Sequence, residues 1–239
     1  MVAQFVAALE RPISRIRLEN YRDGGSDLDM AVNYFYNLEL SEALYPTLQA
    51  LEIALRNSVH QTLSQHFNNP YWFDTPRLYP APPPPETVPW QEKAIQETRD
   101  TLTNEKKSHD PDRIVAEMHL GFWNSLFNRP FVQPLWLPNQ GALLAQVFPH
   151  ATRTQQVPRY IQKRITRIRL LRNRVMHYEP IWSRQHLQQN HAQVREMLSW
   201  ISSAMHDTIK MCDRFPDRLT VGRADMQQRI QDEIQKRNP

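Results

Sequence analysis

The chain has 239 residues, of which 40% are hydrophobic and 10% aromatic, a composition that supports a folded core and argues against wholesale disorder. Only 5 glycines occur and alternating β-branched runs are scarce, so the composition favours a largely helical protein. The formal net charge is +4, and the single cysteine, Cys212, excludes an internal disulfide framework and a multi-cysteine zinc site.

The first 23 residues mix apolar and basic positions without a firm period, and residues 24–27 predict a loop that caps the following helix. Helical periodicity starts at Leu28, resumes at Ser41 and extends to Phe67. Pro46 lies inside this run and predicts either a kink or the true start of the second helix.

The polar face of this helix has an unusual repeat. Glu52, Arg56 and His60 recur every four residues, and Asn57 lies beside them. Glu52 and Arg56 have the spacing of an ordinary ion pair within a helix, which stabilises a helix by only about 0.2–0.5 kcal/mol. The alternative is that this face presents Arg-Asn and a histidine to a cleft shared with another helix.

Residues 68–90 contain eight of the prolines together with five aromatic side chains. Such a dense proline run favours extended polyproline geometry and cannot lie inside a helix. We predict an inserted loop that its aromatic side chains pack against the surface.

The rest of the chain predicts further helices. The first is polar and exposed, the next is capped by Asp110 and ended by Arg129-Pro130, and the segment from Phe131 to Pro138 is broken by prolines. The predicted ranges are 91–109, 111–127, 139–148, 157–177, 184–215 and 217–237. The last of these helices is mostly polar, which predicts a loosely docked arm or a partner-binding helix.

Charge is concentrated in one segment. Residues 151–184 carry nine Lys/Arg and a single acid, Glu179, and 23 of the 29 cationic residues in the chain are arginines. Arginine suits bidentate contact with phosphate and stacking on bases. The segment therefore predicts a polyanionic partner, although a solvated helix face is the common alternative.

The basic helix ends in Arg172-Asn173-Arg174-Val175-Met176-His177-Tyr178-Glu179-Pro180. Asn173 and His177 are four residues apart and share a helix face, while Arg172 diverges from His177 by roughly 140°, within reach of a long side chain. These side chains can therefore converge on one ligand. Basic residues near the end of a helix also simply favour the exposed carbonyl groups, so the motif alone is weak.

Metal-free RNA cleavage needs little more than these groups. The substrate supplies the 2′-hydroxyl nucleophile, a histidine moves protons, and a guanidinium stabilises charge on the phosphorane. His-Glu-x-x-His, Gly-rich phosphate loops and a Gly-x-Ser-x-Gly elbow do not occur in the sequence, so the motifs predict neither a metal nor another cofactor.

Three segments carry a resemblance to a known family: Leu48–Asn57, Gly121–Phe127 and Leu170–Pro180, the last followed by Trp182. Together they resemble the Abi-like (abortive infection) family of the HEPN superfamily, over residues from about 30 to 205. The resemblance implies an all-α HEPN-like bundle. From the length of the chain we expect a single domain over residues 1–239, with its core at about 28–210 and additional helices.

The resemblance also implies a site and a function. It implies Arg172, Asn173 and His177 as catalytic residues of a metal-independent ribonuclease in phage defence or of toxin type. Around them we expect supporting or substrate-binding residues, namely Glu52, Arg56, Asn57, His60, Arg169, Arg174 and Tyr178. The proline-rich loop at 68–90 lies outside what the resemblance explains.

The expected partners are an RNA substrate, a second copy of the chain in a homodimer, and an antitoxin or phage trigger. No stretch reaches the ~18 apolar residues of a membrane span and the N-terminus carries no basic leader, which predicts a cytoplasmic protein without a membrane partner. Two other functions remain open. One is a non-catalytic HEPN module that binds nucleic acid or protein, and the other is DNA binding through the basic helix.

Overall fold

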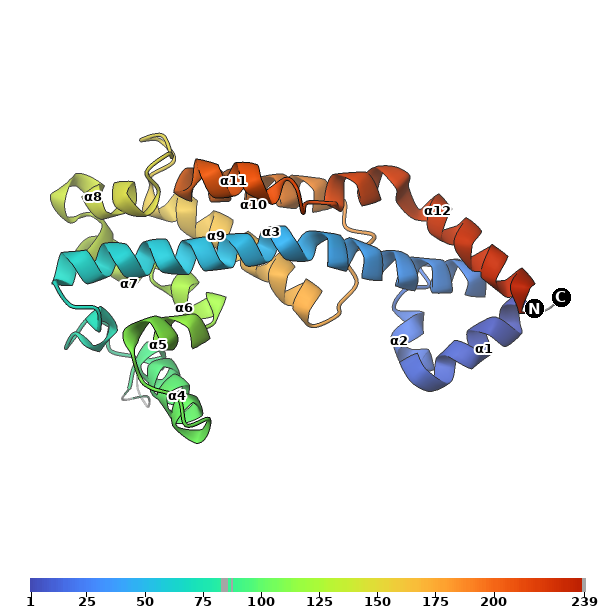
Figure 1. Cartoon of the computed structure of the whole chain (residues 1–239), viewed down its shortest axis with the longest axis horizontal. Coiled ribbons are helices and arrows are strands. Elements are labelled where there is room, and N and C mark those ends of the chain that lie inside the picture. The colour runs from blue at the N-terminus through green and yellow to red at the C-terminus, as the bar shows by residue number, and fades with distance from the viewer. Residues whose placement is uncertain (83–85, 87, 238–239) are drawn as a thin grey trace. The chain divides into compact units, whose positions relative to one another are not determined.

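The computed structural model of the chain describes residues 1–82, 86 and 88–237 (Figure 1). Within these residues the chain forms twelve α-helices, one 3₁₀-helix and one π-helix, and no strand. The predicted all-α class is therefore confirmed. No helix in this part of the chain combines the length and the apolar character needed to cross a membrane.

The α-helices follow one another in chain order as α1 (Val2–Ile13), α2 (Arg15–Glu19), α3 (Asp27–Phe67), α4 (Trp90–Asn104), α5 (Pro111–Glu117), α6 (Leu120–Ser125), α7 (Arg129–Phe131), α8 (Pro138–Val147), α9 (Pro158–Met176), α10 (Leu187–Ile201), α11 (Ser203–Ile209) and α12 (Phe215–Lys236). The 3₁₀-helix η1 spans Trp72–Asp74, and the π-helix η2 spans Val132–Trp136.

The chain divides into two compact units that share its long helices. Unit 1 comprises Met1–Leu48, Leu171–Ala192 and Ile209–Pro239. Unit 2 comprises Gln49–Leu170 and Gln193–Thr208. Helices α3, α9 and α10 each contribute one part to unit 1 and another part to unit 2.

In unit 1, α1 and α2 pack beside the N-terminal end of α3 (Figure 1). Ser26 precedes α3 and exchanges hydrogen bonds with Asp29: the Ser26 N–H donates to Asp29 Oδ2 at 3.0 Å, and the Asp29 N–H donates to Ser26 Oγ at 3.1 Å. This reciprocal pair is a capping box, and it confirms the cap predicted at residues 24–27. The core beneath α3 is formed by Val6, Leu18, Tyr21, Met30 and Ala31.

Helix α12 is firmly docked in unit 1, so the predicted loose arm is wrong. Its apolar side chains Met226, Ile230 and Ile234 are buried. Its cations are also used, since Arg223 donates from Nε to Asn33 Oδ1 at 2.6 Å and Arg229 pairs with Glu39 of α3. These polar contacts, as well as apolar packing, hold the helix in place, although most of its residues are polar.

Unit 2 is built around aromatic side chains. Trp72 and Phe122 are fully buried, and Phe122 meets Trp123 edge to face with ring centroids 5.1 Å apart. Trp72, together with Phe73 and Tyr79, packs the segment at 68–90 into this core, as predicted from its aromatic content. The polyproline geometry predicted for Pro82–Pro85 falls mostly on Pro83, Pro84 and Pro85, which lie outside the described residues.

The boundaries of several elements differ from the predictions. Helix α3 is continuous through Pro46, which therefore does not start a helix. Residues 1–23 form α1 and α2, although their sequence shows no firm period. Arg129-Pro130 starts α7 rather than ending a helix, because proline is favoured in the first turn, where its missing N–H costs nothing. The segment that follows α7 is not broken but forms the π-helix η2.

Candidate functional site

The predicted catalytic motif lies at the C-terminal end of α9, in unit 1. Arg172 and Asn173 are half-buried in the last turns of the helix. His177 follows the last helical residue, Met176, and its side chain is exposed to solvent. The His177 N–H donates to the Asn173 carbonyl at 2.8 Å, so the helical path that places these two residues on one face continues to the histidine.

A tight backbone closure ends the helix directly after His177. The N–H of Tyr178 donates to the Val175 carbonyl at 3.2 Å, and the N–H of Glu179 donates to the Arg174 carbonyl at 2.8 Å. These bonds form a Schellman motif, in which the residue after the C-cap takes a left-handed conformation. Here that residue is Tyr178, with φ 59°, where glycine is usual. The closure fixes the backbone at His177.

Glu179, the only acidic residue in the basic segment 151–184, forms an ion pair at this helix end. Arg174 Nη1 lies 3.0 Å from Glu179 Oε2, and their side chains are 38% and 49% exposed. An exposed pair of this kind contributes at most about 1 kcal/mol. Its main effect is on charge, because it neutralises Arg174, which was predicted to support substrate binding.

Unit 1 clamps the peptide that follows His177. Arg17 of α2 donates from Nη2 to the carbonyl oxygen of Tyr178 at 2.7 Å, and the Tyr21 hydroxyl lies 3.4 Å from the same oxygen. The Arg17 guanidinium also lies 6.0 Å from the centroid of the Tyr178 ring, which is 68% exposed. Burial raises the pKa of the Tyr21 hydroxyl, so this group stays protonated and remains a donor.

The next turn is held from α3. The side-chain oxygen of Asn37 accepts the N–H of Ile181 at 2.7 Å and that of Trp182 at 3.2 Å, and its amide nitrogen lies 3.4 Å from the Tyr21 hydroxyl. Asn37 is 2% exposed, so each of these bonds is made away from water. The sequence did not point to Arg17, Tyr21 or Asn37, because each lies more than 130 residues before the motif.

The second predicted motif, on α3 in unit 2, has mainly a packing role. Arg56 donates from Nη1 to the carbonyl oxygen of Ala116 at 2.8 Å. Ala116 lies in the last turn of α5, where carbonyl groups lack partners within the helix. Arg56 therefore caps α5. This contact explains the arginine without a substrate, and its predicted role in substrate binding stays a prediction.

His60 contacts the other end of α5. Trp72 donates from Nε1 to His60 Nδ1 at 3.0 Å, so the neutral ring carries its proton on Nε2, which lies 3.5 Å from Asp112 Oδ1. Burial lowers the pKa of His60, and the Asp112 carboxylate opposes this shift. Both ring nitrogens thus face protein groups.

The other predicted site residues on α3 and α9 differ in how far their side chains are exposed to solvent. Asn57 is exposed, whereas Glu52 and Arg169 are half-buried. Arg169 has a buried Nε without a hydrogen-bond partner in the described part of the chain. Unit 1 contains Arg172, Asn173, Arg174, His177 and Tyr178, and unit 2 contains Glu52, Arg56, Asn57, His60 and Arg169.

Among the described residues, no group of three or more His, Cys, Asp or Glu side chains is arranged to hold a metal ion. No protein-family model, curated protein or solved structure matches this chain. The family resemblance drawn from the three sequence segments therefore stays a prediction.

Proposed function

We propose that the chain is a metal-independent RNA endonuclease of the Abi-like HEPN type, with Arg172, Asn173 and His177 as its catalytic residues. The observation that carries the proposal is the exposed His177 imidazole on a backbone fixed by the Schellman closure and by the Arg17 clamp. A general acid or base must be accessible to substrate and held in place; the exposure of the His177 side chain and the fixed backbone around it support this role.

The proposed reaction uses the 2′-hydroxyl of the substrate. His177, in its neutral form, accepts the 2′-OH proton as O2′ bonds to phosphorus, and the bond from phosphorus to O5′ breaks. The leaving O5′ takes a proton from a second acid, either water or the protonated His177 of a second copy of this chain. The products are a 2′,3′-cyclic phosphate and a 5′-hydroxyl, and no oxidant or cofactor is needed.

The two polar neighbours have distinct proposed roles. Arg172 stabilises the negative charge that grows on the phosphorane oxygens, as a fixed guanidinium does most effectively away from bulk water. Asn173 shares a helix face with His177 and orients the imidazole or the phosphate through its amide. We propose that Tyr178, whose ring is exposed, stacks on a base of the bound strand.

The partners follow from this proposal. A site with one histidine gains its second acid from a homodimer, so we propose dimerisation. Phage defence or toxicity, with an antitoxin or phage trigger as regulator, is proposed from the family resemblance alone. Growth arrest on expression, relieved by His177→Ala, tests this cellular role.

A second candidate function is a non-catalytic HEPN module that binds nucleic acid or protein. One observation favours it: Arg56 and His60, expected to extend an active site, are bonded to α5 and to Trp72 instead. Incubation of purified protein with single-stranded RNA in EDTA separates the two functions. Cyclic-phosphate products support the endonuclease, whereas retention of intact RNA supports the binding module.

A further inference from the structure

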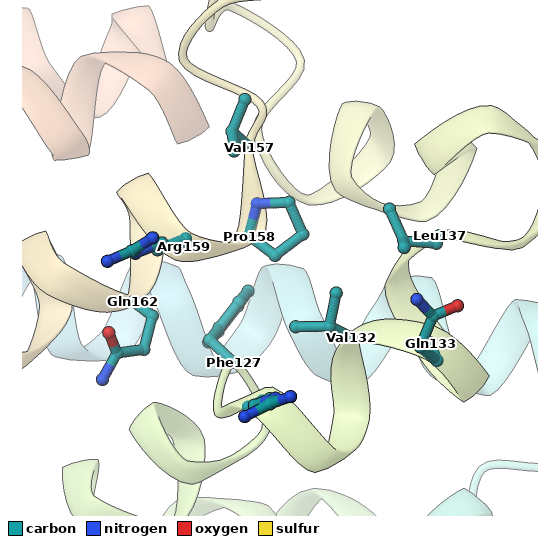
Figure 2. Close-up of a pocket in the computed structure, with 9 residues that line it drawn as sticks. Phe127, Val132, Gln133, Leu137, Val157, Pro158, Arg159 and Gln162 are labelled. Atoms are coloured by element: carbon teal, nitrogen blue, oxygen red, sulfur yellow. The ribbon is translucent and has the colours of Figure 1, made fainter.

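Unit 2 contains a cavity of about 880 Å³ at the N-terminal end of α9 (Figure 2). This volume lies within the roughly 300–1,000 Å³ of typical small-molecule sites. The apolar part of its wall is formed by Phe127, Val132, Leu137, Val157 and Pro158. Leu137 and Val157 are each 45% exposed, so the cavity opens to solvent along an apolar rim.

The polar part of the wall is cationic. Arg129 of α7 and Arg159 of α9 both line the cavity, and none of the described residues that line it is acidic. Both side chains are exposed, and in the described part of the chain neither forms an ion pair or a side-chain hydrogen bond. Two guanidinium groups without counter-charges beside an apolar wall are complementary to a ligand that has both a phosphate and a flat apolar ring.

Amide groups add hydrogen-bonding capacity. Gln162 lies beside Arg159 on α9, and Gln133 lies on the opposite side of the cavity with Leu137 (Figure 2). Gln162 donates from Nε2 to Thr166 Oγ1 at 3.2 Å, which leaves its side-chain oxygen as an acceptor. Gln133 belongs to the π-helix η2, a rare geometry that occurs often at functional sites.

The positive charge continues from the cavity along α9. Arg159, Lys163 and Arg167 recur every four residues, which places them on one helix face about 6 Å apart along the axis. All three side chains are exposed and without an ion pair among the described residues. Arg164, by contrast, pairs with Glu196 and lies over the rings of Tyr160 and Trp200. The open cations therefore form a track that starts at the cavity.

We propose that this cavity binds one nucleotide of a single-stranded RNA, with its phosphate between Arg129 and Arg159 and its base on the apolar wall. The strand then continues over Lys163 and Arg167, which contact its phosphates. The choice of RNA rests on the proposed function. The cavity itself lies within unit 2 and contains none of the proposed catalytic residues.

The test is the binding of fluorescein-labelled single-stranded 2′-O-methyl RNA, which cannot be cleaved by 2′-oxygen attack, measured by anisotropy over a range of salt concentrations. We expect Arg129→Ala/Arg159→Ala to weaken binding at least tenfold and to lower the slope of log affinity against log salt by about 1.4. Leu137→Glu, on the exposed rim, should weaken binding as well by placing a carboxylate in the cavity. The matched control, Arg153→Ala/Lys106→Ala, removes the same charge from exposed positions outside the cavity.

Unchanged binding in the cavity variants overturns the inference. So does an equal loss in the control, which would mean that total charge alone governs binding, and so does equally tight binding of duplex DNA. Displacement of the RNA by a free nucleoside monophosphate supports a nucleotide site. RNA binding that survives the variants while the monophosphate no longer binds assigns the cavity to free nucleotides and overturns the RNA assignment. If ordinary RNA is bound but never cleaved, the proposed function fails while the cavity assignment stands.

Discussion

The guanidinium of Arg17 and the carbonyl oxygen of Tyr178 are joined by a hydrogen bond of 2.7 Å between residues 161 positions apart. A charged donor makes such a bond stronger than one between neutral groups. Tyr178 directly follows the proposed catalytic His177, so this contact holds the backbone one residue after the imidazole, at the peptide group between Tyr178 and Glu179. Arg17 is therefore a positioning residue, and its removal should affect the histidine without touching the substrate.

We expect Arg17→Ala to lower kcat for RNA cleavage about tenfold with little change in KM, because misplacement of a catalytic group mainly affects the chemical step. Loss of the charged hydrogen bond should also lower the free energy of unfolding by about 1–2 kcal/mol. Arg17→Lys keeps a charged donor, so it should restore part of the lost kcat and part of the lost free energy of unfolding. Steady-state kinetics and urea denaturation measure the two effects.

Arg11→Ala serves as the control for this substitution. Arg11 is an exposed arginine on the neighbouring helix α1, and its removal changes the net charge equally. A fall in kcat in both variants would indicate a general effect of charge and would refute the positioning role of Arg17.

The left-handed backbone of Tyr178 gives a second prediction. A side chain at φ 59° costs about 1–2 kcal/mol that glycine avoids. Tyr178→Ala and Tyr178→Gly both remove the ring, but only glycine removes the strain. We therefore expect Tyr178→Gly to unfold with a free energy about 1 kcal/mol higher than Tyr178→Ala. Equal stabilities in urea would contradict the conformation described for this helix end.

The sequence predicted α9 correctly, but the helices predicted at 111–127 and 184–215 are each divided in two, as α5 and α6 and as α10 and α11. The stripe on α9, which includes Ile161, Ile165 and Leu171, lies in the core as its 3.6-residue period indicates. The helix ends at Met176, one residue before the predicted boundary, and Glu179-Pro180 follows. Local periodicity and proline were sufficient here because both act within a few residues.

Contacts across long sequence separations could not be predicted. The segment at 1–23 forms two helices because it packs on α3, and its own periodicity is too weak to show this. Arg56 and His60 have the spacing of site residues, but their partners, Ala116 and Trp72, are set by tertiary structure. A polar residue on a helix face has the same sequence signal whether it binds a substrate or caps a neighbouring helix.

The packing role of Arg56 predicts a loss of stability. Arg56→Ala removes the cap of α5 and should lower the free energy of unfolding by about 1–3 kcal/mol. Its neighbour Asn57 is exposed, so Asn57→Ala should stay within about 0.5 kcal/mol of the wild type. A stable Arg56→Ala variant with weakened RNA binding would instead restore Arg56 to the substrate site.

The lowered pKa of His60 predicts that the free energy of unfolding depends on pH. Burial lowers its pKa below the usual value of 6.5, so below that pH the unfolded state binds more protons than the folded state. The stability that the neutral ring contributes is complete above pH 6.5 and is lost as the pH falls through the lower folded-state pKa. Protonation of Nδ1 also breaks the hydrogen bond from Trp72.

The matched variant is His60→Gln, whose amide oxygen accepts from Trp72 but does not titrate. Urea denaturation at pH 7.5 and pH 5.5 should show a larger loss of stability in the wild type than in this variant. The other histidines are common to both proteins, so the difference reports on His60 alone. A difference of the opposite sign would mean that Asp112, rather than burial, governs its pKa.

The central claim concerns the exposed imidazole of His177. The most direct measurement is cleavage of single-stranded RNA in EDTA by the wild type and by His177→Ala, with products resolved by their termini. We expect 2′,3′-cyclic phosphate ends from the wild type, a rate about 10²–10⁴-fold lower in the variant, and the same free energy of unfolding within about 0.5 kcal/mol. Cleavage at an unchanged rate by a folded His177→Ala variant, or no cleavage by either protein, would contradict the account.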